Sequence, residues 1–301
     1  MKEIIVLSSK NYDNSETTNY GDCILINTGT ELIIYDCGHE AHANVVIDYM
    51  AQNGFNKAKL ILSHNDSDHF DGVLKLLSED KLSVIRTTLL LKYKDKILEK
   101  IDDNRKTRDS VAKQILALYD NIAKLTGAPL EDIYEHPESL CNEVSIIGPD
   151  FDYMIETVAK RLDGREGNTI DGETAVNATS IQVGVKIGIH SLLLCGDCSF
   201  PAIEDIVRNY DAVQLPHHGK NKQAEKIFEK KADQVYSVYI VSDNTGNTNG
   251  GSDNLNTIGH RVYNTKKSGD ITINSSIFSA SYVRTGRVLG VWSCSSYCKN
   301  V

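Results

Sequence analysis

The chain has 301 residues, of which 41% are hydrophobic and 24% are charged, and its 32 Lys and Arg against 41 Asp and Glu leave a net charge of −9. This composition is typical of a globular protein with enough chain to bury a core, and it excludes a disordered chain, a collagen and a coiled-coil rod. The net negative charge also argues against a protein that coats nucleic acid by charge alone, because such binding requires Lys and Arg to neutralise phosphates. A local basic groove is compatible with this net charge.

The sequence contains no sign of a membrane-spanning or exported protein. No apolar stretch approaches the roughly 18 residues of a membrane-spanning helix, and the first apolar run ends at Leu7. The seven cysteines are an odd number, and several stand inside apolar runs, so they do not suggest a disulfide framework. We therefore expect a cytoplasmic protein.

Strands dominate the first part of the chain. Runs of aliphatic and β-branched residues predict strands at 4–7, 23–26, 32–35 and 60–62. The second and third of these form a hairpin, and helical spacing over 43–50 predicts a helix before the fourth. The segment at about 73–130 is expected to be mostly helical, to carry the densest charge in the chain, and to contain a short strand near 89–91.

The rest of the chain repeats this alternation. A helix is predicted over 223–231 and a loop rich in Gly, Asn and Ser over 243–256. Strands are predicted at 144–147, 180–185, 191–194, 212–215, 235–241, 271–274 and 288–292. Because the strands come in two batches, each interleaved with helices, we expect an α/β fold of two sheets packed face to face with helices outside, in one domain over 1–301.

A dense group of potential metal ligands directly follows the predicted strand 60–62. His64, Asp66, Asp68 and His69 fall within six positions, and a turn there lets imidazole and carboxylate groups converge on one cation. The alternative is an ordinary turn, since Asn, Asp and Ser make turns through their own side chains. Turn chemistry does not require two histidines framing two acids, so the sequence favours a metal site.

Two further motifs end predicted strands. Gly196-Asp197 follows the strand 191–194, and a carboxylate there can bridge two cations, although such residues often merely cap the next helix. His217-His218 follows the strand 212–215, and because adjacent side chains point in different directions we expect at most one of the two as a ligand. Together with the first group, these strand ends predict one shared site.

These motifs resemble, in order, those of the metallo-β-lactamase superfamily. The resemblance rests on Asp36 in Tyr35-Asp36-Cys37-Gly38, the His-x-Asp-x-Asp-His run, Gly196-Asp197 and His217-His218-Gly219. The closest variety is similar to the hydrolase domain of the DNA-uptake protein ComEC, which likewise has an Asp at the position of Asp66 and an Asn and a Ser at those of Asn177 and Ser180.

The resemblance implies a four-layer αββα sandwich with one or two divalent ions, Zn or Mn, at the edge of the sheets. Asp36 would orient a ligand without touching metal. Asp68 and Asp197 would be the catalytic residues, with Asp68 accepting a proton from metal-activated water. The metal ligands would be His64, Asp66, Asp68, His69, Asp197 and either His217 or His218. Substrate would meet Asn177, Ser180, Lys220 and His260.

Three departures from the superfamily pattern shape these expectations. The superfamily usually supplies another ligand histidine between the His-x-Asp-x-Asp-His run and the Gly-Asp strand. Here only His136 and His190 lie in that interval, and both are expected to be ordinary turn residues. One metal would therefore bind more weakly than the other. Asp66 replaces a more usual histidine, which favours manganese or magnesium relative to zinc. Lys220 stands where the subgroup has a small hydroxyl residue.

The leading functional hypothesis is a metal-dependent phosphodiesterase or nuclease acting on a nucleic acid or nucleotide. It rests on the resemblance and on a group of lysines beside His218, which either engage phosphates or decorate an exposed helix: Lys220, Lys222, Lys226, Lys230 and Lys231. Two alternatives stay open. One is hydrolysis of a lactone, thioester or amide by the same centre, and the other is a metal-stabilised binding component of a multiprotein system such as phage defence, with a protein partner.

Overall fold

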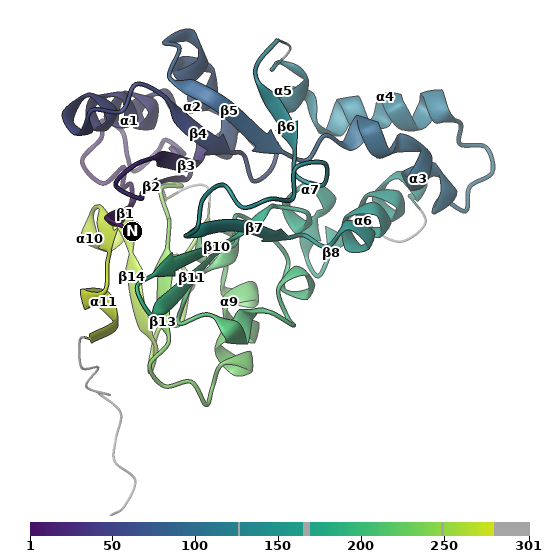
Figure 1. Cartoon of the computed structure of the whole chain (residues 1–301). Coiled ribbons are helices and arrows are strands. Elements are labelled where there is room, and N and C mark those ends of the chain that lie inside the picture. Colours follow the sequence, from purple (N-terminus) through teal and green to yellow (C-terminus); the bar gives the residue numbers. More distant parts are fainter. Residues whose placement is uncertain (126, 165–168, 248–249, 280–301) are drawn as a thin grey trace, which may run out of the picture.

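Two β-sheets lie face to face in the computed structural model, which describes residues 1–125, 127–164, 169–247 and 250–279 (Figure 1). The first sheet has seven strands in the order β15-β1-β2-β3-β4-β5-β6, and the second has six in the order β14-β13-β12-β11-β10-β7. The strands of the first sheet are β1 (Glu3–Val6), β2 (Cys23–Asn27), β3 (Leu32–Cys37), β4 (Ala58–Ile61), β5 (Leu82–Thr87), β6 (Leu130–Asp132) and β15 (Ile271–Ile273). Those of the second are β7 (Val144–Gly148), β10 (Gln182–Ile187), β11 (His190–Leu194), β12 (Ala212–Gln214), β13 (Val238–Val241) and β14 (Arg261–Asn264).

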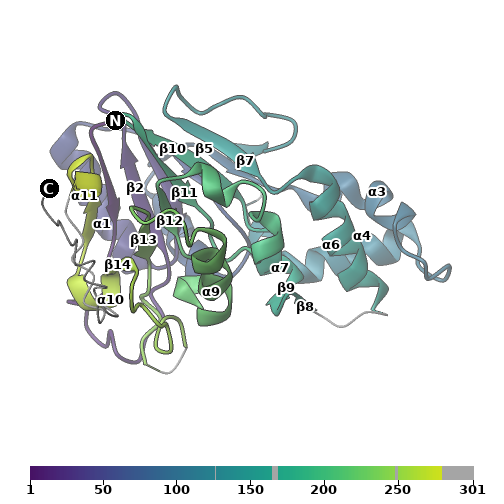
Figure 2. The same cartoon turned by 90° about the horizontal axis from the view of Figure 1, so that it is seen from below.

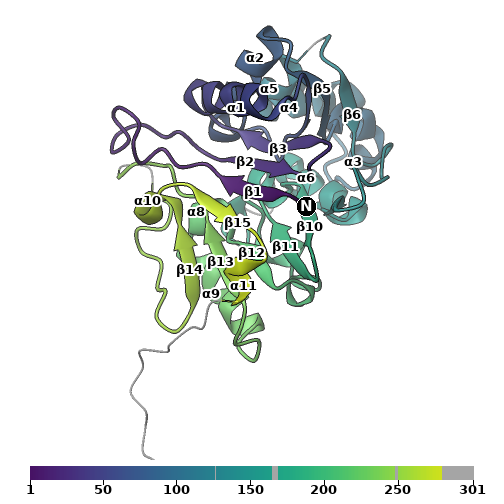
Figure 3. The same ribbon diagram turned by 60° about the vertical axis from the view of Figure 1, so that its left-hand side comes forward.

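Helices cover the outer face of each sheet. The helices α1 (Glu40–Asn53) and α2 (Ser67–Ser78) lie beyond the first sheet, and α9 (Asn221–Lys230) lies beyond the second (Figures 1 and 3). A helical lobe extends from one side of the sandwich and contains α3 (Lys94–Glu99), α4 (Arg108–Leu118) and α6 (Phe151–Asp163) (Figure 2). Short helices complete the fold: η1 (Leu90–Tyr93), α5 (Asp120–Ala123), α7 (Ala175–Ala178), η2 (Phe200–Ala202), η3 (Val207–Asn209), α8 (Pro216–Gly219), α10 (Thr265–Ser268) and α11 (Ser276–Ser279).

The central strands are apolar on both faces because each sheet is covered on both sides. In β2, Ile24 and Ile26 belong to the core between the sheets, whereas Leu25 packs under the outer helices. In β11, Leu192 and Leu194 face the other sheet and Leu193 faces the layer of α9. Because successive side chains of a strand point to opposite faces, each run of aliphatic residues contributes to two cores. The α/β prediction with an αββα arrangement is confirmed.

The prediction of a strand near 89–91 is wrong. The strand of this segment is β5, and Leu90 instead begins η1 and packs in the core of the helical lobe with Ile97, Val111 and Ile115. A run of three leucines does not distinguish a strand from a helix start, whereas β5 contains Val84 and Ile85, which favour extended backbone. The strand predicted at 288–292 lies outside the described residues.

The fold brings several strand ends to one edge. The strands β3, β4 and β5 run parallel to one another, as do β11, β12 and β13. Asp36, His64, Asp197 and His217 each stand at or just beyond the carboxyl end of one of these strands, so they meet at the same edge of the sandwich. In the described part of the chain no helix is long and apolar enough to cross a membrane.

Candidate metal centre

The carboxylate of Asp197 lies among four imidazole rings. Its Oδ1 is 3.3 Å from Nε2 of His69. Its Oδ2 is 3.9 Å from Nε2 of His64, 3.8 Å from Nε2 of His217 and 3.9 Å from Nε2 of His218. Histidines that follow two separate strands, β4 and β12, therefore present the same ring nitrogen to one buried carboxylate.

Both adjacent histidines face this carboxylate because of an unusual backbone. His217 and His218 each have a positive φ, of 52° and 55°, a conformation that is uncommon outside glycine. A bond from the backbone N–H of His217 to the carbonyl of Gly196 holds the turn against the strand end that carries Asp197. The expectation that the two rings would point in different directions assumed an ordinary turn, and two successive left-handed residues turn both rings toward Asp197.

Asp36 fixes the two histidines of the first motif. Its Oδ2 lies 2.8 Å from Nδ1 of His69 and also accepts the hydroxyl of Ser63 at 2.6 Å. The same hydroxyl lies 2.9 Å from Nδ1 of His64. Because Nδ1 of each ring is engaged in this way, Nε2 is the nitrogen left to face Asp197.

Asp22 and Glu173 fix the other two histidines, and neither acid was predicted to have a role at the site. Asp22 is fully buried, and its Oδ1 lies 3.0 Å from Nδ1 of His218. Glu173 is also buried and lies 2.5 Å from Nδ1 of His217. Glu173 belongs to the small hairpin of β8 (Thr169–Ile170) and β9 (Glu173–Thr174), and nothing in its local sequence indicates that this hairpin folds over the site.

The acids of the first motif border the cluster. Asp68 Oδ2 is 3.1 Å from Nε2 of His218 and accepts a bond from Nδ2 of Asn19 at 2.8 Å. Asp66 Oδ2 is 3.7 Å from Nε2 of His64. Asp66 stands at the N-cap of α2 but its side chain makes no capping bond to the described helix, so capping does not explain its presence.

The donor atoms of the cluster fit a divalent cation. Nε2 of His64, Nε2 of His69 and Oδ1 of Asp197 are buried and find no hydrogen-bond partner among the described residues. The ligand atoms of these three residues lie within 4.8 Å of one another. The ligand atoms of Asp22, His69 and His218 form a second group of the same size. Unpaired buried polar atoms are costly, whereas imidazole nitrogen and carboxylate oxygen are the ligands that zinc and manganese take.

The charges of the cluster are strongly coupled. Burial lowers the pKa of His69, but the carboxylates of Asp197 and Asp36 outweigh it and raise that pKa well above its usual range. Burial likewise opposes ionisation of Asp197, yet the charges of His69, His218 and His217 hold its pKa well below normal. The raised pKa of His69 favours its protonated form when no cation is bound, and a metal ion bound by His69 would displace that proton.

Asn177 and Ser180, expected to meet substrate, support Asp197. Nδ2 of Asn177 donates to Oδ2 of Asp197 at 3.3 Å. Ser180 is fully buried, and its hydroxyl accepts the backbone N–H of Asp197 at 3.2 Å. Ser180 has no exposed surface here and positions Asp197, so its contact with substrate stays a prediction.

Lys220 and His260 have different surroundings. Nζ of Lys220 is 2.9 Å from a carboxylate oxygen of Glu173, so it reaches the cluster through the acid that holds His217. His260 directly precedes β14, at the end of the parallel strands opposite the cluster, and stacks on Phe228 with ring centres 3.8 Å apart. The structure thus does not bring His260 to the cluster. The sequence alone does not show which end of a strand lies at the site.

Asp22 is expected to control how well the cluster holds metal. Changing Asp22 to asparagine removes the charge that orients His218, and partners of this kind typically affect metal affinity by 10–100-fold. We expect about that loss in a competitive titration with a chelating dye. Asp253→Asn, which alters an exposed acid paired with Lys266, is the control. Equal affinity in the Asp22 variant and the native protein would contradict this role.

A glycine contact fixes the position of Asp68. The carbonyl of Asp68 accepts the backbone N–H of Asp22 at 2.9 Å, and a Cβ atom on Gly38 would lie 1.9 Å from that carbonyl oxygen. Gly38→Ala must therefore displace Asp68, and we expect a destabilisation of about 1–3 kcal/mol together with lost metal affinity. Gly54→Ala strains a left-handed helix end with open space around it, so it should lower stability while leaving metal affinity intact. Unchanged metal affinity in Gly38→Ala would refute the contact.

Comparisons with known proteins show the superfamily and the fold of this chain. The sequence matches the Metallo-beta-lactamase superfamily over residues 17–242. It is 37% identical over 62 residues to a hydroxyacylglutathione hydrolase of Pseudoalteromonas translucida (strain TAC 125), a match that covers 21% of this chain and 23% of that protein. The metallo-beta-lactamase fold protein YhfI of Bacillus subtilis has a similar structure, with a TM-score of 0.51 and 14% identity over 90% of this chain and 100% of the other.

Proposed function

The chain belongs to the metallo-β-lactamase superfamily of metal-dependent hydrolases, and we propose that it hydrolyses phosphodiesters, with a nucleic acid or nucleotide as substrate. The observation that carries the proposal is the position of Asp197, whose two oxygens face different histidines. A carboxylate so placed can contact two cations, and paired cations suit phosphodiesters because they stabilise both the attacking and the leaving oxygen. The likeness of Asp66 and Asn177 to the ComEC hydrolase domain supports the same choice.

In this proposal two sets of ligands would share Asp197. His64, His69 and Asp66 would hold one cation, and Asp68, His218 and His217 the other. When bound, the cations supply an acidified water and polarise the bond under attack. Three carboxylates among these ligands favour manganese or magnesium more than a histidine-rich site would.

The chain's own residues orient the reaction. Asp36, Asp22 and Glu173 fix the histidine rings, and Asn177 and Ser180 fix Asp197, so the ligand atoms stay in place when substrate arrives. The oxygen of Asp68 held by Asn19 is the proposed acceptor of the proton that water loses.

A second candidate, hydrolysis of a lactone, thioester or amide, gains support from the lysines near the site. Lys220 pairs with Glu173, Lys226 with Asp171 and Lys230 with Glu204, while the side chain of Lys231 is buried. These lysines are therefore largely neutralised and supply less attraction for phosphate than the sequence suggested.

A panel of substrates tests the proposal. The purified protein is assayed with Mn²⁺, Mg²⁺ or Zn²⁺ against bis(p-nitrophenyl) phosphate, DNA, p-nitrophenyl acetate, a lactone and a thioester. We expect the phosphodiesters to be cleaved with the higher kcat/KM, and His64→Ala to abolish cleavage while His260→Ala, at the opposite end of the strands, retains it.

The other outcomes are equally informative. Faster cleavage of the carbonyl substrates would replace the first proposal with the second. Activity that survives His64→Ala would reject the site. A protein that metal stabilises but that cleaves nothing in the panel would instead be a binding component of a larger assembly.

A further inference from the structure

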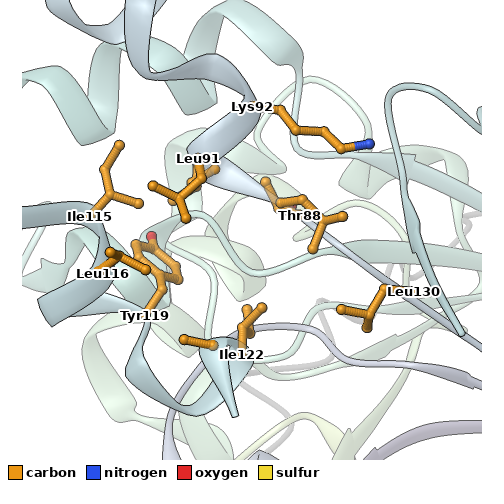
Figure 4. A pocket seen from close by; sticks show the side chains of 11 residues that line it. Thr88, Leu91, Lys92, Ile115, Leu116, Tyr119, Ile122 and Leu130 are labelled. Carbon is orange, nitrogen blue, oxygen red and sulfur yellow. The ribbon is translucent and has the colours of Figure 1, made fainter. Parts of the chain in front are cut away.

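An apolar pocket of about 380 Å³ opens where the helical lobe meets the first sheet (Figure 4). Its walls come from η1, α4, α5 and β6, four elements of the segment between β5 and β7. The side chains that define it are Leu91, Ile115, Leu116, Tyr119, Ile122 and Leu130. The volume lies within the roughly 300–1,000 Å³ that is typical of sites for small organic ligands.

The pocket exposes large apolar side chains to solvent. Leu91 of η1 is 38% exposed and Leu116 of α4 is 43% exposed. Both leucines line the same pocket although they come from different helices. Large apolar side chains that gather around a concave surface indicate a site that a ligand covers.

One buried polar group stands in this apolar wall. Thr88 is 8% exposed, and its hydroxyl finds no hydrogen-bond partner in the part of the chain that the structure describes. A buried hydroxyl without a partner is costly, and Thr88 is one of the residues that line the pocket. A ligand that brought an oxygen or an N–H group to Thr88 would satisfy it, as the few polar groups of apolar pockets commonly do.

The pocket lies beside the metal cluster. Thr88 directly follows β5, whose parallel neighbour β4 leads to His64. A smaller cavity lies between them, bordered by His64 on one side and sharing Thr88, Leu90 and Tyr119 with the apolar pocket. The polar end of a ligand in the pocket would therefore be directed toward the reacting centre.

We propose that this pocket binds an apolar alkyl or aryl group of the substrate, with Thr88 bonding a polar atom at the end of that group nearest to the cluster. The inference rests on the proposed function for its link to catalysis and names the substrate class more narrowly: an ester whose organic part is apolar. The apolar walls exclude a purely ionic ligand, and the unpaired hydroxyl selects an amphiphilic one over a pure hydrocarbon.

Direct binding tests the pocket without any catalysis. Octanamide, an eight-carbon amide, is titrated into the whole protein by calorimetry. We expect saturable binding that Leu116→Trp weakens at least about tenfold, because the larger ring fills the pocket. Leu74→Trp is the matched control, since Leu74 is also a helical leucine and is 43% exposed but does not line the pocket. Thr88→Val removes an unpaired hydroxyl and keeps the shape, so it should leave the fold intact and weaken binding about fivefold.

Catalysis tests the link to the substrate. The kcat/KM values for methyl and butyl p-nitrophenyl phosphate are compared, because each buried methylene contributes up to about fourfold. A preference for butyl of about tenfold or more that Leu116→Trp removes supports the proposal. Equal kcat/KM values for the two esters overturn it and leave the proposed hydrolase activity standing.

The binding experiment and the kinetic experiment can fail independently of each other. If octanamide binds as expected and no ester is cleaved, the pocket is a ligand site and the proposed function is wrong. If octanamide does not bind, or binds Leu116→Trp as tightly as the native protein, the proposal is overturned, and the exposed leucines would instead be covered by an apolar segment of a protein.

Discussion

Changing Asp197 to asparagine is expected to lower kcat/KM toward the cleaved substrate by at least about 10³-fold. The native carboxylate faces four imidazole nitrogens, and the amide removes its charge while directing either an oxygen or an N–H₂ group at them. If Asp197 holds cations as proposed, loss of its charge removes several kcal/mol of transition-state stabilisation, and about 4 kcal/mol corresponds to a thousandfold change in rate. Steady-state kinetics with the best substrate of the panel measures the effect.

The control for this change is an acid outside the cluster. Asp233 is exposed and paired with Arg208, so Asp233→Asn should keep native activity. Thermal unfolding of both variants shows whether they are folded. If folded Asp197→Asn retained more than about a tenth of the native kcat/KM, Asp197 would not lie between the reacting groups.

Removal of metal is expected to lower the melting temperature by about 10 °C. The cation binds the folded protein, and at a free concentration about a thousandfold above its dissociation constant it stabilises by about 4 kcal/mol. For a chain of this size each kcal/mol shifts the melting temperature by about 2–4 °C. Calorimetry with and without EDTA, followed by addition of excess Mn²⁺ or Zn²⁺, measures the loss and its recovery.

The same experiment on Asp197→Asn identifies where the stabilising metal binds. Its melting temperature should respond much less to EDTA than that of the native protein, because the shared ligand is missing. Equal responses would place the stabilising cation elsewhere, and no response in the native protein would remove metal from the account of its stability.

The sandwich and the first metal motif could be predicted from sequence because both are local patterns. Aliphatic runs with a period of two define strands covered on both faces, and His64, Asp66, Asp68 and His69 lie within one turn and the first turn of a helix. The strand-end position of Asp197 and of the two histidines after β12 then predicts that the three motifs meet at one edge.

Two of the supporting residues, Asp22 and Glu173, could not be predicted because their partners lie far away in the chain, whereas the role of Asp36 was expected from the resemblance. Asp22 reaches His218 across 196 positions, and Glu173 reaches His217 from a two-stranded hairpin with no local signal. His260 illustrates the opposite case: it flanks a strand, as His64 and His217 do, but at its amino end. A sequence shows which residues flank a strand, and tertiary packing decides which of them lie near one another.

Residues 89–91 show a third reason why prediction from sequence fails. Leu89-Leu90-Leu91 predicted a strand, whereas packing against Ile97 and Ile115 draws Leu90 into the lobe core and leaves Leu91 at the pocket. Apolar content alone does not separate burial in a sheet from burial among helices. The pocket was therefore not predictable, because its walls come from four elements whose arrangement is set by that packing.

Anomalous diffraction from crystals grown with Mn²⁺ or Zn²⁺ tests the central claim most directly. We predict one or two peaks within about 2.0–2.3 Å of His64, His69 and Asp197 and of Asp68 and His218. The partly exposed group of Glu131, His136 and Glu138 is the competing position, although Arg86 already pairs with both of its glutamates. A metal found there, with no peak beside Asp197, would contradict the account.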